Sequence, residues 1–209
     1  MSKGVKSLMY RKDDNNDLFE FIDSLGPEIN KKKHVVVFYE APDRSRNIEF
    51  RFIKNGLLKQ EHCVYTIAEH TDISFIEREM NDYGIEVDKY KDNLLHIYYT
   101  PYPLASQEDI VKNRETTMKT VLSSLKSPFR IISTLLPELK TKEQIKANVD
   151  IEHKIHYNFN QFHGSFICTY NVKNIINDIT GKWMRNMLLS HHNAIFLPKS
   201  SNGLILNLS

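Results

Sequence analysis

Polar side chains that could bind a ligand follow the short apolar runs of this sequence. Tyr39 and Glu40 close the run that begins at His34, and Arg44 and Arg46 come shortly afterwards. The ends of later runs carry Glu69, His70, Tyr99 and Tyr170. Hydroxyl and carboxylate groups at such positions can hydrogen-bond a small molecule, and guanidinium groups can pair with an anion. The plainer alternatives are strand capping, a surface ion pair between Glu40 and Arg44, and solvated side chains at the start of a helix.

Histidines form a second group of candidate residues. His153 and His156 make an H-x-x-H motif, and His163 follows seven residues later. On a helix the first two would share a face, which suits a transition metal, but neither a carboxylate nor a thiol is placed to complete the set. We therefore expect no metal and no cofactor. His191 and His192 are expected to end a helix, where a protonated imidazole interacts favourably with the helix dipole.

The remaining candidates have structural interpretations of equal or greater weight. Cys168 and Tyr170 are two positions apart in an apolar run, so on a strand they share one face. We expect the cysteine to be a buried small hydrophobe. His34 starts a strand, opposite the expected ligand end, and is expected to make a structural hydrogen bond. The aromatic segment with Tyr99 and Tyr102 would suit an apolar ligand wall or plain core packing.

The elements that must position these residues alternate between two patterns. Short β-branched runs at 34–39, 63–67, 94–99, 129–135 and 165–170 predict strands. Helical spacing predicts helices at about 13–25, 42–59, 71–84, 106–125 and 138–160, and another that ends near 190. Residues 194–197 and 204–208 predict a closing hairpin. Strands separated by helices favour a mostly parallel sheet, which binds ligands beyond the carboxyl ends of its strands.

The composition is that of one globular unit. The chain has 209 residues, of which 41% are hydrophobic and 26% are charged, so a multidomain machine and a disordered chain are excluded. A net charge of +2 gives no electrostatic case for nucleic acid or an anionic membrane. Two cysteines make no disulfide framework. The polar start and the absence of a long apolar run predict a soluble cytoplasmic protein without a membrane segment.

Residues 38–69 resemble the corresponding stretch of the RecA/KaiC ATPases. The shared spacing is F-x-x-x-G-L-x-x-x-E-x-x-x-Y, which is met here by Phe52, Gly56, Leu57, Glu61 and Tyr65. The resemblance implies the architecture of a P-loop protein, in which a strand, a turn and a helix hold the nucleotide phosphates.

The residues that grip phosphate in that architecture are replaced. By the resemblance, Ser45 stands at the place of the Walker A lysine and Ser133 at that of the Walker B acid. Residues 39–47 contain neither glycine nor lysine, so the ring of backbone amides and the fixed charge are both missing. We expect no ATP hydrolysis. The alternative is an atypical ATPase in which Arg44 or Arg46 replaces the lysine.

A more specific resemblance is to the MEDS domain, the sensory domain of methanogens and methylotrophs that is best known from a dichloromethane-responsive repressor. Its pattern is a histidine that opens the first strand, Tyr-Glu at its end, G-L-x-x-x-E before the second strand, and C-x-Y and a histidine near the C-terminus. The matching residues are His34, Tyr39-Glu40, Gly56-Leu57 with Glu61, Cys168-Thr169-Tyr170 and His191-His192. The resemblance spans about residues 33–208.

The resemblance implies a fold and a division of the chain. The fold is α/β, a three-layer RecA/KaiC-like (P-loop NTPase-like) structure with degenerate Walker motifs, a mostly parallel sheet and a C-terminal antiparallel hairpin. Residues 1–30 would form an N-terminal tail and helix, and residues 31–209 the MEDS-like domain.

The function implied is that of a non-catalytic sensory domain in signal transduction. It would bind a small, hydrocarbon-type ligand and signal to a separate output protein, a regulator or kinase, because the chain has no length for the repressor's DNA-binding helix-turn-helix. The alternatives are the atypical ATPase and a ligand-free interaction scaffold that forms homo-oligomers. The candidate ligand-binding residues are Tyr39, Glu40, Arg44, Ser45, Arg46, Glu69, Tyr99, Ser133 and Tyr170.

Overall fold

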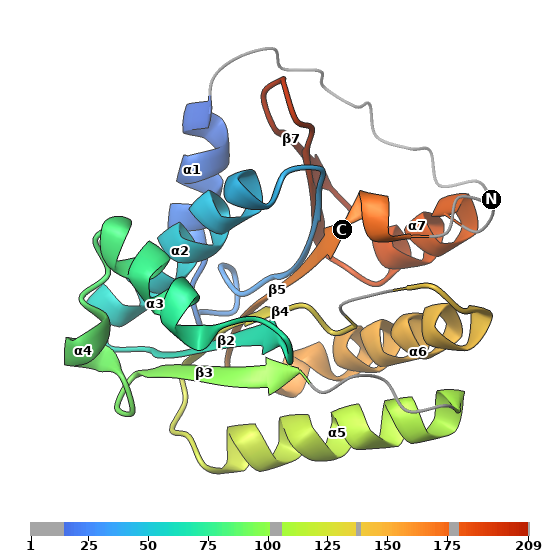
Figure 1. Ribbon diagram of the computed structural model, residues 1–209, viewed down its shortest axis with the longest axis horizontal. Helices are drawn as coiled ribbons and strands as arrows, with labels where there is room; N and C mark the ends of the chain where they lie inside the picture. Colours follow the sequence, from blue (N-terminus) through green and yellow to red (C-terminus); the bar gives the residue numbers. More distant parts are fainter. Residues whose placement is uncertain (1–14, 101–105, 137–138, 176–179, 209) are drawn as a thin grey trace.

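The computed structural model describes residues 15–100, 106–136, 139–175 and 180–208, and its strands form one sheet (Figure 1). Within these residues the strand order is β3-β2-β4-β5-β1-β6-β7. The strands are β1 (His34–Tyr39), β2 (His62–Ala68), β3 (Leu95–Thr100), β4 (Phe129–Ser133), β5 (Gly164–Asn171), β6 (Asn193–Leu197) and β7 (Leu204–Asn207). All neighbouring strands are parallel except β6 and β7, which form an antiparallel hairpin. The predicted α/β sheet and its closing hairpin are confirmed.

Helices cover both faces of the sheet and make the molecule three layers thick (Figure 1). One face carries α1 (Asn15–Ser24), α2 (Pro42–Leu58), α3 (Ile73–Asp82) and the short α4 (Val87–Tyr90). The other face carries α5 (Gln107–Ser123), α6 (Lys142–Asn158) and α7 (Thr180–Leu189). No described helix combines the length and the apolar character that a bilayer crossing requires. The predicted tail at residues 1–12 and the aromatic Tyr102 lie outside the described residues.

The central strand β1 is buried on both faces, as its continuous apolar run predicts. Val35 and Val37 pack under α1 and α2, whereas Val36 and Phe38 pack under α6 and α7. Alternating side chains of one strand therefore belong to two separate cores. His34 points to the same side as Val36.

Some boundaries differ from those predicted. α6 begins at Lys142 rather than near residue 138, because Thr141 and Gln144 form a capping box that fixes the first turn. A short 3-10 turn, Phe159–Gln161, extends its end. β4 ends at Ser133, two residues earlier than predicted, and α4 was not predicted.

A buried ion pair joins the connection after α2 to β4 and explains the G-L-x-x-x-E motif. Arg130 of β4 is fully buried and donates to both carboxylate oxygens of Glu61, at 2.8 and 3.3 Å. Its remaining donors reach the backbone oxygens of Phe52 (3.2 Å) and Leu25 (2.7 Å). Gly56 leaves room for this side chain, since a Cβ there would lie 2.4 Å from Arg130 Cδ. The motif thus has a structural role in this chain.

Gly164→Ala is expected to lower the free energy of unfolding by about 1–3 kcal/mol. A Cβ at this first residue of β5 would lie 2.0 Å from the backbone oxygen of Phe129, and β4 is held between two strands and cannot move aside. Gly181→Ala is the matched control, because nothing lies within 4 Å of its Cβ position in α7. That change should instead stabilise by about 0.4–1 kcal/mol. Urea unfolding measures both, and equal effects would contradict the packing described.

Candidate functional site

A small cavity opens where four parallel strands end. Its walls are the carboxyl ends of β1, β2, β4 and β5 and the first turns of α2, and its volume is about 220 Å³. We call it the strand-end cavity. Its polar lining residues are Tyr39, Ser45, Arg46, Glu49, Tyr65, Thr66, His70, Thr71, Thr134, Thr169 and Asn174. The structure therefore brings together three of the predicted ligand-binding residues, Tyr39, Ser45 and Arg46, at the edge of the sheet where ligands of α/β proteins bind.

Glu49 is the buried carboxyl group of this cavity. The hydroxyls of Ser45 and Tyr65 each donate to one of its oxygens. Burial raises the pKa of Glu49, although both hydroxyl hydrogen bonds and nearby Arg46 oppose the rise. Burial, followed by the charge of Glu49, raises the pKa of Tyr39 to about 12. The cavity thus offers a ligand hydroxyl groups and one buried carboxyl group.

The entry to α2 is not arranged to hold phosphate. The helix begins at Pro42, which has no N–H, and Asp43 adds a negative charge to its first turn. Ser45, at the place of the lysine, is buried and bonded to Glu49. A phosphate-binding turn needs free backbone amides and positive charge, and this one presents a carboxylate instead.

Arg44 and Glu40 point to the connection between β6 and β7. The Arg44 guanidinium donates to the backbone oxygens of Pro198 (2.6 Å) and Ser201. The Glu40 carboxylate accepts from the backbone N–H of Lys199 (2.9 Å). Both residues were candidates for ligand binding or for pairing with each other. Their contacts tie the start of α2 to the hairpin connection, and neither lines the strand-end cavity.

Arg46 and Ser133 are at or next to the cavity but already have partners. Arg46 pairs with Glu79 (2.8 Å) and lies over the ring of Phe75. Ser133 is buried and accepts a hydrogen bond from Thr66 (3.0 Å), whose side chain lines the cavity. A ligand that bound Arg46 would compete with the Glu79 ion pair.

The other three candidates lie away from the cavity. Glu69 is exposed at the end of β2, whereas its neighbour His70 lines the cavity. Tyr99 is 45% exposed on β3, at the edge of the sheet. Tyr170 is buried and points to the opposite face of the sheet, toward α6 and α7.

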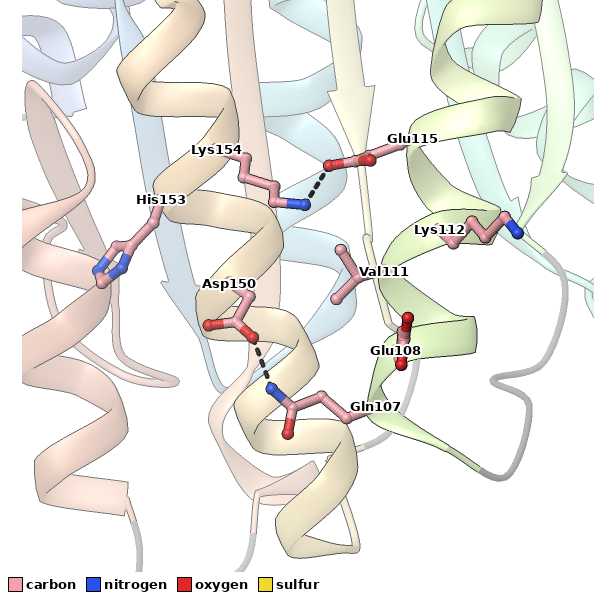
Figure 2. Close-up of a pocket in the computed structure, with 8 residues that line it drawn as sticks. All are labelled: Gln107, Glu108, Val111, Lys112, Glu115, Asp150, His153 and Lys154. Atoms are coloured by element: carbon pink, nitrogen blue, oxygen red, sulfur yellow. Dashed lines mark hydrogen bonds and ion pairs between the residues drawn. The ribbon is translucent and has the colours of Figure 1, made fainter.

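A larger groove runs over the surface between α5 and α6 (Figure 2). Its volume is about 670 Å³. Its polar side chains contact each other across the groove: Lys154 forms an ion pair with Glu115, and the Gln107 amide donates a hydrogen bond to Asp150 (2.6 Å). Such mutually satisfied, solvated pairs are typical of a helix surface. We therefore regard the strand-end cavity, with its buried carboxyl group, as the better ligand site.

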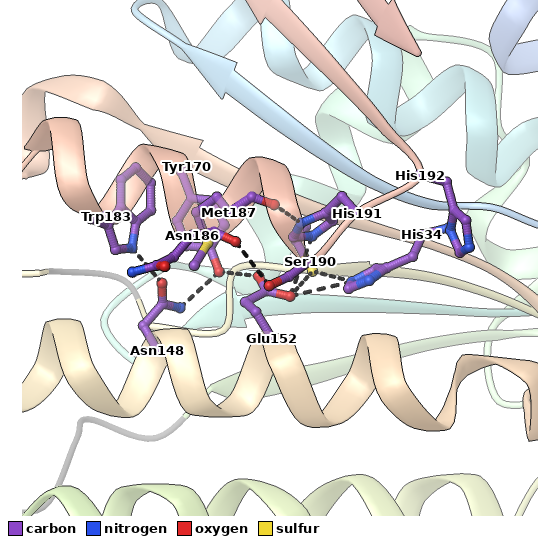
Figure 3. A network of polar contacts seen from close by, with 11 residues as sticks. His34, Asn148, Glu152, Tyr170, Trp183, Asn186, Met187, Ser190, His191 and His192 are labelled. Atoms are coloured by element: carbon purple, nitrogen blue, oxygen red, sulfur yellow. Dashed lines mark hydrogen bonds and ion pairs between the residues drawn. The ribbon is translucent and has the colours of Figure 1, made fainter. Parts of the chain in front are cut away.

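Tyr170 contacts a second polar group, which is buried between the sheet and α6 and α7 (Figure 3). Its centre consists of His34, Glu152, Cys168 and His191, which we call the buried cluster. None of the four is more than 3% exposed. His34 begins β1, Cys168 lies in β5, Glu152 lies in α6, and His191 follows α7. One ligand atom of each residue lies within 4.8 Å of the others, and all four are types that bind transition metals.

Glu152 is the centre of the contacts in the buried cluster. One of its oxygens lies 3.3 Å from Nε2 of His34 and 3.3 Å from Nε2 of His191, and accepts from the Cys168 thiol at 3.4 Å. The other oxygen accepts from the hydroxyl of Tyr170. Burial alone would raise the pKa of Glu152, but the nearby His191 and, after it, His34 favour the charged form and outweigh the burial. The pKa is therefore lowered and the carboxylate is ionised.

The protonation states of the neighbours follow from the same burial. Burial, reinforced by His191, lowers the pKa of His34 to about 3, so this ring is neutral at pH 7. Burial and the Glu152 charge raise the pKa of the Cys168 thiol well above its usual value. Among the described residues, Nδ1 of His34 and Nε2 of His191 are buried without a hydrogen bond.

An outer chain of hydrogen bonds orients Glu152 (Figure 3). The Tyr170 hydroxyl, which donates to Glu152, accepts from Asn148 (2.8 Å), and the Asn148 oxygen accepts from the indole N–H of Trp183 (2.8 Å). The rings of Tyr170 and Trp183 pack edge to face. The carboxylate therefore has one oxygen fixed by the protein and the other directed at the two histidines and the thiol.

Sequence patterns pointed only weakly to these residues. Glu49 follows Ser45 by four positions, which on a helix puts both on one face, and that spacing was an available signal. Glu152 directly precedes the H-x-x-H motif, but the helix turns Glu152 inward whereas His153 lines the surface groove. The carboxylate and thiol missing from the histidine motif are present, beside a different pair of histidines. Their separation along the chain hides them from any local pattern.

Comparisons with known proteins bear on the family and on the fold. The sequence profile of a family described as "MEDS: MEthanogen/methylotroph, DcmR Sensory domain" matches residues 33–192. Among solved structures, a KaiC-like protein from the hyperthermophilic archaeon Pyrococcus horikoshii OT3 is similar, with a TM-score of 0.56 and 16% sequence identity over 84% of this chain and 78% of that chain. No curated protein matches in sequence. The structural likeness bears on the fold alone.

Proposed function

Because this chain belongs to the MEDS family of sensory domains, we propose that it senses a small molecule in the strand-end cavity and signals to a separate output protein. The strongest support comes from the turn between β1 and α2, where a P-loop protein would hold phosphate. There, a compact cavity is lined by hydroxyls around the buried carboxyl group of Glu49. The same observation disfavours an ATPase, because a triphosphate would meet this carboxyl group rather than amides and a lysine.

The size and chemistry of the cavity limit the ligand. At about 220 Å³ it is smaller than the roughly 300–1,000 Å³ of typical ligand pockets. Hydroxyls from Ser45, Tyr65, Thr134 and Thr169 can donate to or accept from a ligand oxygen. These features favour a small uncharged compound, such as a short hydrocarbon derivative with a hydroxyl or carbonyl group.

The signal would pass through the start of α2. A ligand that hydrogen-bonds Glu49 competes with Ser45, which lies in the first turns of that helix. Arg44 in the same turns is bonded to Pro198 and Ser201 beyond β6. A shift of α2 would therefore move the exposed β6–β7 connection, and an output protein that binds there would detect the change. Ligand binding would act by favouring one of two arrangements of these segments.

Thr169→Val is expected to weaken binding of a neutral ligand by about 10-fold, because it removes a hydroxyl from the cavity at nearly constant volume. The probes are short alcohols, short aldehydes, dichloromethane and magnesium ATP, screened by thermal unfolding and then by calorimetry. The control is Thr116→Val on the exposed surface of α5, which should leave binding unchanged. Tight binding of magnesium ATP with no neutral probe bound, or equal effects of both substitutions, would overturn the proposal.

A further inference from the structure

The buried cluster has the spacing of a tetrahedral metal site. Bonds of about 2.0–2.1 Å to nitrogen and oxygen and about 2.3 Å to sulfur, at tetrahedral angles, put neighbouring ligand atoms about 3.3–3.6 Å apart. The fold brings four such atoms together from distant positions in the sequence. Glu152 lies 3.3 Å from each histidine, and Cys168 Sγ lies 3.4 Å from Glu152 and 3.5 Å from His34. These four separations are near the edge length of a coordination tetrahedron, and the remaining pairs of ligand atoms lie within 4.8 Å of each other.

The hydrogen bonding of His191 directs a lone pair into this space. Its Nδ1 lies 2.6 Å from the backbone oxygen of Met187, an acceptor only, so Nδ1 carries the proton. In the neutral ring Nε2 is then an acceptor, and it faces the Glu152 carboxylate without a hydrogen bond. Two buried acceptors 3.3 Å apart need a cation between them or a second proton on the ring. A histidine that gives its other N–H to a backbone carbonyl is the usual arrangement around a bound metal.

Charge balance favours a divalent ion. With two neutral histidines, an ionised Glu152 and an ionised Cys168, the four ligands carry two negative charges, which a divalent cation cancels in a region without solvent. Without a cation, the buried carboxylate has only a histidine proton to balance it. The outer oxygen of Glu152 is already held by Tyr170, as the outer oxygens of ligating carboxylates commonly are.

We propose that His34, Glu152, Cys168 and His191 bind one divalent transition-metal ion, zinc by ligand type, in a closed four-coordinate site. On binding, the Cys168 thiol releases its proton to solvent and the thiolate sulfur bonds to the metal. The site joins β1, β5, α6 and the segment that follows α7. It is separate from the strand-end cavity and does not depend on the function proposed for that cavity.

The test is cobalt binding to the whole chain after removal of metal by chelation under reducing conditions. Wild-type protein should bind one Co²⁺ per chain, with the strong visible bands of tetrahedral cobalt and a near-ultraviolet thiolate-to-cobalt band, and zinc should displace it. Stoichiometric metal bound with no thiolate band, or no metal bound at micromolar concentrations, overturns the proposal and leaves a hydrogen-bonded network.

Variants assign the ligands. Cys168→Ser should abolish the thiolate band, and both this change and His191→Gln should lower zinc affinity by at least about 100-fold. Cys63→Ser is the matched control, since Cys63 is equally buried but lies in the core on the other face of the sheet. His153→Gln, beside Glu152 but in the surface groove, is the second control. Controls that lose the band as Cys168→Ser does would overturn the assignment. The wild-type cobalt spectrum decides the matter even if a variant fails to fold.

Discussion

Glu61→Gln is expected to lower the free energy of unfolding by about 3–5 kcal/mol. The change leaves the Arg130 guanidinium fully buried without its counter-ion, and desolvation of that charge is then uncompensated. The two remaining backbone acceptors, on Phe52 and Leu25, cannot neutralise it. Denaturant unfolding monitored by circular dichroism measures the loss.

The control is a solvent-exposed ion pair of the same protein, between Glu86 and Lys89. Glu86→Gln removes the partner of Lys89 (3.2 Å), and with 72% and 56% of these side chains exposed the stability should hardly change. A double variant, Glu61→Gln with Arg130→Met, should recover part of the lost stability, because it also removes the buried, unpaired guanidinium charge. Equal destabilisation by Glu61→Gln and Glu86→Gln would show that the Arg130 pair is not buried as described.

Trp183→Ala is expected to lower the free energy of unfolding by about 3–5 kcal/mol. Trp183 is 1% exposed, packs edge to face against Phe38 and Tyr170, and fills the space between α7 and the sheet. Trp183→Phe keeps much of the ring volume but leaves the side-chain oxygen of Asn148 without its hydrogen-bond donor. The free energy of unfolding should then fall by about 1–3 kcal/mol.

Leu189→Ala on the same helix is the comparison, since its side chain is 65% exposed. Its effect should stay within about 0.5 kcal/mol. Urea unfolding monitored by circular dichroism suits this series, because the chain has a single tryptophan and both Trp183 variants remove it. If Leu189→Ala were as costly as Trp183→Ala, the packing of α7 on the sheet would be wrong.

The fold could be predicted from the sequence where local patterns were unambiguous. The apolar run that forms β1 predicts a doubly covered strand, and the alternation with helices then favours parallel neighbours. The predicted start of α6 was too early, because apolar spacing begins before the point where Thr141 and Gln144 cap the helix. Capping decided the boundary, not periodicity.

The candidate sites were predicted less completely, for a different reason. The rule that ligands bind at strand ends located the cavity and three of its residues. It could not show that Arg44 would turn toward Pro198, because that acceptor is far away in the sequence. His34, Glu152, Cys168 and His191 come from four separate elements, so no motif reports their meeting. Sequence spacing identifies residues that share an element and is silent about those that meet across elements.

The position of β1 in the sheet also bears on how the chain is made. Both of its partners, β5 and β6, lie toward the C-terminus and begin at Gly164 and Asn193. While a ribosome is still adding those segments, the apolar strand that starts at His34 has no neighbour to pair with. The central strand of the finished sheet is thus among the first to be synthesised and among the last to be paired, which exposes the nascent chain to aggregation.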